Sequence, residues 1–121
     1  MLSLTTEETA NIATIEGFIA AWNAKDPLGA VACLAEDFRF TFGKIGRTPN
    51  FGQPDFATIM ANATSVSMAI TPGTNWARGP VVCHERKDHI RFKDGTTAGG
   101  RFIAVYTLRD GRIVDFIDFE I

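Results

Sequence analysis

The sequence predicts a single α+β domain over residues 1–121, in which N-terminal helices pack on a curved antiparallel sheet and enclose a pocket. Three observations support this fold class. Apolar residues recur at helical spacing in the first third of the chain, whereas from Ser65 onward apolar and polar residues alternate as in strands. In addition, Lys93-Asp94-Gly95 and Arg109-Asp110-Gly111 repeat one turn pattern sixteen residues apart, which predicts two consecutive hairpins.

The first helix is expected from Thr5 to about Ala24. Thr5 and Glu8 have the spacing of a capping box, in which each side chain satisfies a backbone N–H group at the start of a helix. The apolar residues that follow are three and four positions apart and form one inward-facing stripe. They are Ile12, Ile15, Phe18, Ile19 and Trp22.

A second, short helix is expected after Asp26, which can cap it, and Pro27, which suits its first turn. Its buried side would consist of Leu28, Val31, Ala32 and Ala35. A half-buried strand should follow, because Phe38, Phe40 and Phe42 alternate with polar residues.

Residues 43–52 are rich in Gly, Pro and Asn and are expected to form a loop. A third short helix is predicted to begin near Pro54 and to bury Phe56, Ile59, Met60 and Ala63. The first strand after it would start at Ser65, with Val66, Met68 and Ile70 in alternation, and end in a turn at Thr71-Pro72-Gly73.

The segment Val81–Phe92 is the predicted central strand. Because successive side chains of a strand point to opposite faces, His84, Arg86 and Asp88 share one face with apolar neighbours. Polar groups on a face that should be covered are typical of a functional pocket and unusual in a core. His84 could equally be a core histidine whose hydrogen bonds are satisfied.

The two hairpins predict which residues meet across the sheet. With three-residue loops, Phe92 pairs with Thr96 and Leu108 with Arg112, so that Phe102 lies opposite both Arg86 and Asp118. With two-residue loops, Arg86 and Asp118 flank Ile103 instead. Gly99-Gly100 is expected to form a bulge or a sharp bend in the middle strand, about Thr96 to Leu108. The pocket face would then present His84, Arg86, Asp88, Phe102, Ala104, Tyr106, Phe116 and Asp118.

Two carboxylates beside one guanidinium can perform acid/base chemistry. A carboxylate that accepts hydrogen bonds from arginine stays ionised, while a second one in apolar surroundings can keep its proton. One would be a base and the other an acid. The alternative is an internal salt-bridge network without chemistry.

Composition and charge restrict the class of partner. The net charge is −2 and no long apolar run or basic cluster occurs, so neither a nucleic-acid surface nor a membrane segment is expected, and the cytoplasm is the default location. No metal is expected, because His84 and His89 lack the spacing of a zinc motif.

The other sheet face would carry apolar residues that a homodimer would cover. They are Ile103, Val105, Ile113, Ile117, Phe119 and Ile121.

Several segments together resemble limonene-1,2-epoxide hydrolase and its SnoaL-like relatives in the NTF2-like superfamily. These segments are FIAAWNAKD, LAEDF, FGQPDF, Glu85-Arg86-Lys87-Asp88, Asp110-Gly111-Arg112-Ile113 and Phe116-Ile117-Asp118-Phe119. The resemblance implies a cone-shaped α+β (cystatin-like) fold and a cofactor-free enzyme acting on an apolar small molecule. It also implies roles: Asp118 as the base that activates water, Asp88 as the acid that protonates an epoxide oxygen, and Arg86 as the bridge.

The sequence departs from the family's pattern on the first strand. Phe40 and Phe42 occupy the positions where the hydrolases have a tyrosine and an asparagine that hold water. His84 could supply a replacement polar group, as could Thr41 if the first strand slips by one residue. Tyr106 could donate a hydrogen bond to a substrate oxygen or simply fill space. The substrate pocket would be lined by Phe40, Phe42, Phe102 and Phe116. The alternatives are therefore a SnoaL-like cyclase, a ketosteroid-isomerase-like isomerase, or a domain that binds a ligand without reaction.

Overall fold

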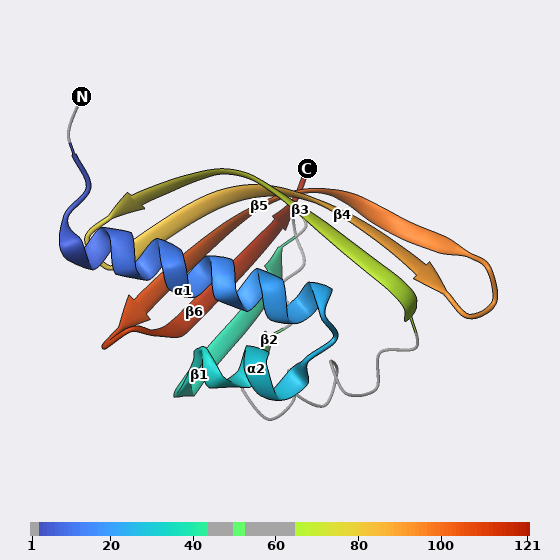
Figure 1. Ribbon diagram of the computed structural model, residues 1–121, viewed down its shortest axis with the longest axis horizontal. Coiled ribbons are helices and arrows are strands. Elements are labelled where there is room, and N and C mark those ends of the chain that lie inside the picture. The colour runs from blue at the N-terminus through green and yellow to red at the C-terminus, as the bar shows by residue number, and fades with distance from the viewer. Residues whose placement is uncertain (1–2, 44–49, 53–64) are drawn as a thin grey trace.

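One long helix lies across the inner side of a curved sheet in the computed structural model, which describes residues 3–43, 50–52 and 65–121 (Figure 1). The sheet has the strand order β2-β1-β6-β5-β4-β3. This arrangement confirms the α+β fold class. β1 and β6 run parallel, so the sheet is mixed, whereas β3, β4, β5 and β6 form the predicted antiparallel meander.

Both predicted N-terminal helices are present. α1 (Thr6–Asn23) starts with the predicted capping box between Thr5 and Glu8. α2 (Pro27–Ala32) is capped by Asp26 and ends before Ala35. Leu28 is 83% exposed and Ala32 is exposed too, so the prediction that these two residues are buried was wrong. The short helix buries Ala30 instead, and two residues correspond to more than half a helical turn, so Leu28 points away.

The strands are β1 (Leu34–Gly43), β2 (Asn50–Gly52), β3 (Ser65–Arg78), β4 (Val81–Phe92), β5 (Thr97–Arg109) and β6 (Arg112–Glu120). The predicted bounds of the central strand, β4, are confirmed. Residues 50–52 pair with β1, so the loop predicted for 43–52 is wrong there. The predicted third helix, with Phe56, Ile59, Met60 and Ala63, lies outside the described residues.

The pairing of β4 with β5 follows the predicted register. Arg86 lies opposite Phe102, as expected. The bulge predicted at Gly99-Gly100 was wrong, because the ladder runs through both glycines without a shift. A Cβ atom on Gly99 would lie 2.2 Å from the carbonyl oxygen of Asp88, so this glycine allows the two backbones to approach closely.

The predicted register between β5 and β6 was wrong by two residues. Asp118 lies opposite Ala104 rather than Phe102. The cause is a tight turn in which Asp110 (φ 52°) and Gly111 (φ 77°) are both left-handed, followed by a shift beyond Leu108. A displacement of two residues preserves the face of a strand, so Asp118 stays on the same side as Arg86.

The register shift in β6 also makes one part of the prediction for the outer face wrong. Ile113 is completely buried in the core, although it was expected among the outward-facing residues. One extra residue on β6, between Ile113 and Asp115, reverses the alternation. Ile103 and Phe119 do face outward, with 37% and 45% exposure.

β3 does not end at the predicted turn. The strand continues through Thr71-Pro72-Gly73 to Arg78, and the chain reverses at Gly79-Pro80. Its register shifts between Pro72 and Asn75, where two residues on β3 oppose the single residue Glu85 on β4. The Gly and Pro signal therefore marks a bulge within a strand rather than its end.

The core lies between α1 and the sheet. Phe18 makes edge contacts with Tyr106 and Phe116, at centroid separations of 6.3 Å and 5.8 Å. Ile15, Phe18 and Ile19 of the predicted stripe are buried, and Ile12 and Trp22 pack beside them.

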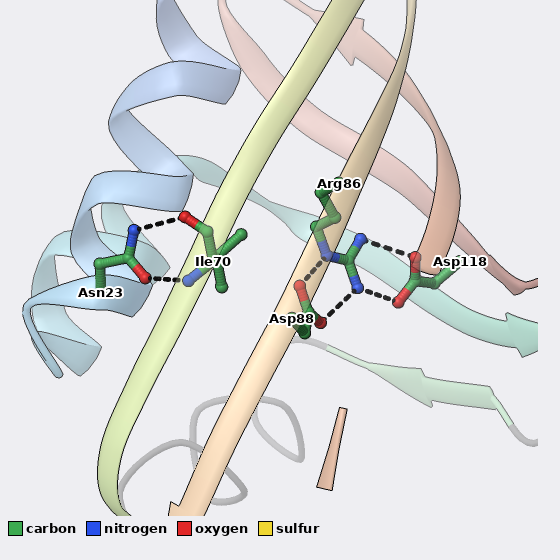
Figure 2. Close-up of polar contacts among 5 residues, drawn as sticks. All are labelled: Asn23, Ile70, Arg86, Asp88 and Asp118. Carbon is green, nitrogen blue, oxygen red and sulfur yellow. Dashed lines mark hydrogen bonds and ion pairs between the residues drawn. The ribbon is translucent and has the colours of Figure 1, made fainter. Parts of the chain in front are cut away.

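Side chains at the two ends of α1 bind the backbone of β3 at Ile70 and the backbone of the turn after β3 at Gly79. Asn23 Nδ2 donates to the carbonyl of Ile70 (3.1 Å), and the N–H of Ile70 donates to Asn23 Oδ1 (2.7 Å), as Figure 2 shows. Near the N-terminus, the Gly79 N–H donates to Glu8 Oε2 (2.7 Å) and Asn11 Nδ2 donates to the Gly79 carbonyl (3.3 Å). The bonds to Ile70 occupy backbone groups of β3, which is an edge strand of the sheet.

Replacing Asn23 with Ala should therefore lower the free energy of unfolding by about 1–3 kcal/mol, because both backbone groups of Ile70 lose a partner. Glu16→Ala, at an exposed position of the same helix, is the control and should change stability by less than about 0.5 kcal/mol. Urea unfolding followed by circular dichroism measures both. Equal losses in the two variants would contradict the role assigned to Asn23.

Candidate active site

Arg86 binds two carboxylates at once on the inner face of the sheet (Figure 2). Its Nε donates to Asp88 Oδ1 (2.9 Å) and its Nη2 to Asp88 Oδ2 (3.2 Å). Its Nη1 donates to Asp118 Oδ1 (2.7 Å) and its Nη2 also to Asp118 Oδ2 (2.5 Å). We call these three residues the trio. Both pairs are bidentate, which fixes the orientation of each carboxylate as well as its distance.

The spacing of residues along the strands explains why the three meet. Arg86 and Asp88 are two residues apart on β4 and so share a face. Asp118 projects from β6 beside Ala104 of β5, whose side chain ends at Cβ. A larger residue at Ala104 would stand between the arginine and the aspartate.

The trio is largely shielded from water. The exposed fractions of the side chains are 7% for Arg86, 12% for Asp88 and 5% for Asp118. The guanidinium carbon also lies 4.7 Å from the centre of the Phe102 ring and 5.9 Å from that of Phe116. Aromatic faces attract a cation most strongly where water is excluded.

Burial and charge shift the pKa of each group in opposing ways. Burial raises the pKa of Asp118, and the hydrogen bonds and charge of Arg86 offset part of this increase. Burial would lower the pKa of Arg86, but its hydrogen bonds and ion pairs with both carboxylates together raise it. Arg86 is therefore a permanent cation, and Asp118 is the carboxyl whose proton affinity is increased.

The other predicted pocket residues surround the trio. Tyr106 and His84 are fully buried, with ring centres 5.3 Å apart, and Phe116 stacks at 4.6 Å from Tyr106. Phe40 packs on Phe116 at 4.8 Å. The backbone of Phe42 lies opposite Asp118, and its side chain is outside the described part.

Three buried polar atoms have no hydrogen-bond partner within the part of the chain that the structure describes. They are His84 Nε2, the Tyr106 hydroxyl and Asn75 Oδ1. Burial, followed by the charge of Arg86, lowers the pKa of His84 to about 4, and burial raises the pKa of Tyr106, so both side chains are neutral at pH 7.

Sequence reasoning missed Asn75. Asn75 lies opposite His84 because of the bulge in β3, and the sequence signal for that bulge, Pro72-Gly73, was interpreted as a turn. A strand that continued past Gly73 with one extra residue would have brought Asn75 onto the face of His84.

The described residues contain no group of three His, Cys, Asp or Glu side chains that could hold a metal ion. No helix among them is long and apolar enough to cross a membrane.

Comparison with known proteins identifies the family. The SnoaL-like domain family matches residues 15–116, which include Arg86 and Asp88 of the trio, whereas Asp118 lies two residues beyond the match. The chain belongs to this SnoaL-like family. No curated protein sequence is significantly similar to it.

Solved structures share the NTF2-like, or cystatin-like, fold. An LEH-like epoxide hydrolase from M. tuberculosis has a TM-score of 0.81 and 22% identity, over 95% of this chain and 85% of that chain. A putative SnoaL-like polyketide cyclase from Jannaschia has a TM-score of 0.78 and 14% identity, over 98% and 90%. A protein with a ketosteroid isomerase-like fold from Catenulispora acidiphila, in complex with trimethylamine, has a TM-score of 0.73 and 19% identity, over 87% and 82%. At these identities the likeness concerns the fold.

The buried His84 predicts a specific acid sensitivity of the fold. Its pKa is about 4 in the folded protein and about 6.5 when unfolded, so the unfolded state binds the extra proton between these values. Stability from neutral His84 is therefore present above pH 6.5 and is lost as the pH falls toward 4, by at most about 3 kcal/mol at 1.36 kcal/mol per pH unit.

The free energy of unfolding in urea is measured at pH 7 and at pH 4.5 for wild type and for His84→Gln. The loss due to His84 is the difference between the decreases that the two proteins show. The variant should lose less stability on acidification. The exposed His89 on the opposite face of β4 provides the control, and His89→Gln should follow wild type. Parallel pH dependences of wild type and His84→Gln would contradict the shifted pKa of His84.

Proposed function

We propose that this SnoaL-like protein is a cofactor-free enzyme that adds water to an epoxide on an apolar small molecule, using Asp118, Arg86 and Asp88. The observation that carries the proposal is the doubly bidentate Arg86, which holds two carboxylates in one largely buried, aromatic-walled site.

Each member of the trio has a proposed role. Asp118, whose pKa burial raises, takes a proton from water as the water oxygen bonds to an epoxide carbon. The C–O bond of the epoxide breaks, and the oxygen that leaves receives a proton from Asp88, the proposed acid. Arg86 bridges the two groups and holds them in position, and after reaction the proton returns from Asp118 to Asp88, with solvent or along the bridge.

The apolar surroundings favour a second candidate. Phe40 presents an aromatic ring against Phe116 at the position where a water-holding side chain was expected. An isomerase or cyclase needs no bound water, because the same acid and base can move a proton within the substrate. A ligand-binding domain without chemistry is the third candidate, in which the trio is an internal network.

The names of the structural neighbours agree with this range of functions. One neighbour is an epoxide hydrolase and another is a putative polyketide cyclase. A third was solved with a small organic ligand, trimethylamine. Each of the three candidates acts on or binds a small molecule, and the labelling experiment below distinguishes them.

Turnover of cyclic and terpene epoxides in oxygen-18 water tests the leading candidate. Wild type should release singly labelled diol, and Asp118→Asn and Asp88→Asn should each reduce the rate at least about a hundredfold, as loss of a general acid or base does. Glu85→Gln is the control, since Glu85 is exposed on the opposite face of β4, next to Arg86. Mass spectrometry of the diol gives rate and label together.

The absence of diol from folded wild type would reject the hydrolase. Rearranged, unlabelled product that also requires Asp118 would support the isomerase or cyclase, and binding without any product would support the third candidate.

We further propose that the outer face of the sheet forms a homodimer interface. Ile103, Phe119 and Ile121 lie on this face with exposures of 37%, 45% and 68%. Adjacent apolar side chains on one sheet face favour a self-complementary interface, and twofold symmetry is the commonest closure.

Phe119→Lys should convert a dimer into monomers, because burying two unpaired lysines at a twofold interface costs several kcal/mol. Sedimentation velocity measures the change. Leu28→Lys, at an apolar position that is 83% exposed on α2, should leave the dimer intact. A monomeric wild type, or a dimer that survives Phe119→Lys, would contradict the proposed interface.

A further inference from the structure

Glu120 is a third carboxylate on the inner face of the sheet, beside the trio. It lies two residues beyond Asp118 on β6, so the side chains of both residues point to the same face. The pairing of β6 with β5 agrees, because Asp118 lies opposite Ala104 and Glu120 lies opposite Phe102. Glu120 is half-buried. Its charge therefore belongs to the surroundings of the trio.

A glycine on the neighbouring strand leaves space for the Glu120 carboxylate. Glu120 Oε1 lies 3.6 Å from the position that a Cβ atom on Gly100 would occupy. Gly100 pairs directly with Asp88 across β4 and β5. The side chain of Glu120 thus leans along the sheet over β5, to the level of Asp88, and a large side chain at position 100 would displace it.

The ring of Phe102 lies between Glu120 and the arginine. Arg86, Phe102 and Glu120 lie opposite one another in one row across β4, β5 and β6. The guanidinium carbon of Arg86 is 4.7 Å from the centre of the Phe102 ring. Two atoms of the same ring lie 3.6 Å and 3.8 Å from the Cβ position on Gly100 that Glu120 Oε1 also approaches. Glu120 therefore adds a negative charge across the ring, while the guanidinium directs its hydrogen bonds to the two aspartates of the trio.

The charges around Asp118 make it easier to protonate. Arg86 supplies one positive charge to the two carboxylates that it binds. Within the described part of the chain, the other titratable side chains packed around them are neutral at pH 7, and α1 and β1 contribute aromatic rings; these residues are His84, Tyr106, Phe18 and Phe40. Burial raises the pKa of Asp118, the hydrogen bonds and charge of Arg86 lower it, and the charges of Asp88 and Glu120 add to the increase.

We propose that Glu120 is a positioning residue for the reaction at the trio: its carboxylate, held over Gly100, acts through Asp118 and favours the transfer of a proton from water to it. This inference rests on the proposed function. The step itself is unchanged, since water loses its proton to Asp118 as the water oxygen bonds to the epoxide carbon. Without the third carboxylate, Arg86 would hold Asp118 in its ionised form more strongly, and Asp118 would be a weaker base.

The titration of the Asp118 carboxyl group tests this role without any substrate. Carbon-13 NMR of protein labelled at the aspartate carboxyl carbons gives the midpoint, and the signal that is missing in Asp118→Asn identifies the residue. Glu120→Gln removes the charge at nearly the same size and should lower the midpoint by roughly 0.5–1.5 pH units, as expected for charges about 7 Å apart, the spacing of alternate residues on a strand. An unchanged midpoint would overturn the proposal, whether or not the protein hydrolyses an epoxide.

Two further variants separate the charge of Glu120 from its contribution to packing. Glu120→Asp keeps the charge on a shorter side chain, and its midpoint should lie closer to that of wild type than the midpoint of Glu120→Gln does. Glu85→Gln removes a carboxylate from an exposed position on the opposite face of β4 and should titrate as wild type does. Equal decreases in all three variants would contradict a specific effect of Glu120.

The pH dependence of kcat/KM for diol formation gives a second measurement. Glu120→Gln should keep its activity to lower pH than wild type, because Asp118 stays ionised further into acid. At higher pH it should be slower by up to about tenfold, because Asp118 is a weaker base. A decrease of the same size at every pH would contradict the proposal. A shifted midpoint without diol from wild type would reject the hydrolase and support the effect of Glu120 on Asp118.

Discussion

Arg86 shares its guanidinium group between two buried carboxylates, and this contact constrains how the central strands of the protein pair. If Arg86 left the interior, Asp118 would remain buried as an unpaired charge. Losing one partner of a buried ion pair typically costs about 3–5 kcal/mol of stability. Three adjacent strands must therefore keep the register that brings these groups together. The aromatic rings of Phe102 and Phe116 complete the enclosure of the cation.

Small residues make this arrangement possible at two points. Ala104 leaves space for Arg86 to reach past β5 to Asp118. Gly99 brings β5 close to the backbone of Asp88, where a Cβ atom would collide with its carbonyl oxygen. The polar trio thus depends on residues that have no polar group, and a substitution by a larger side chain at either site would disturb it as surely as a change of charge.

Much of the fold and of the site could be predicted from the sequence, because the periodicity of apolar residues and the capping of helices depend only on neighbouring residues. The capping box at Thr5, the face of β4 and the meeting of Arg86 with Asp88 and Asp118 all follow from spacing. The register of β6 and the extent of β3 could not be predicted, because each depends on one inserted residue whose position is set by packing. Leu28 was misplaced since a helix of one and a half turns does not reveal which face is covered.

The same insertions that defeat the prediction create the features of interest. The single extra residue in β6 reverses the alternation of its side chains, so that Ile113 and Asp118, which are five positions apart, both face the core. The bulge in β3 bends the strand and aligns Asn75 with His84 beneath a helix that is bound on both sides of it. The regular ladder of β4 and β5 fixes the charged centre, and the irregular strands on either side determine the shape of the space around it.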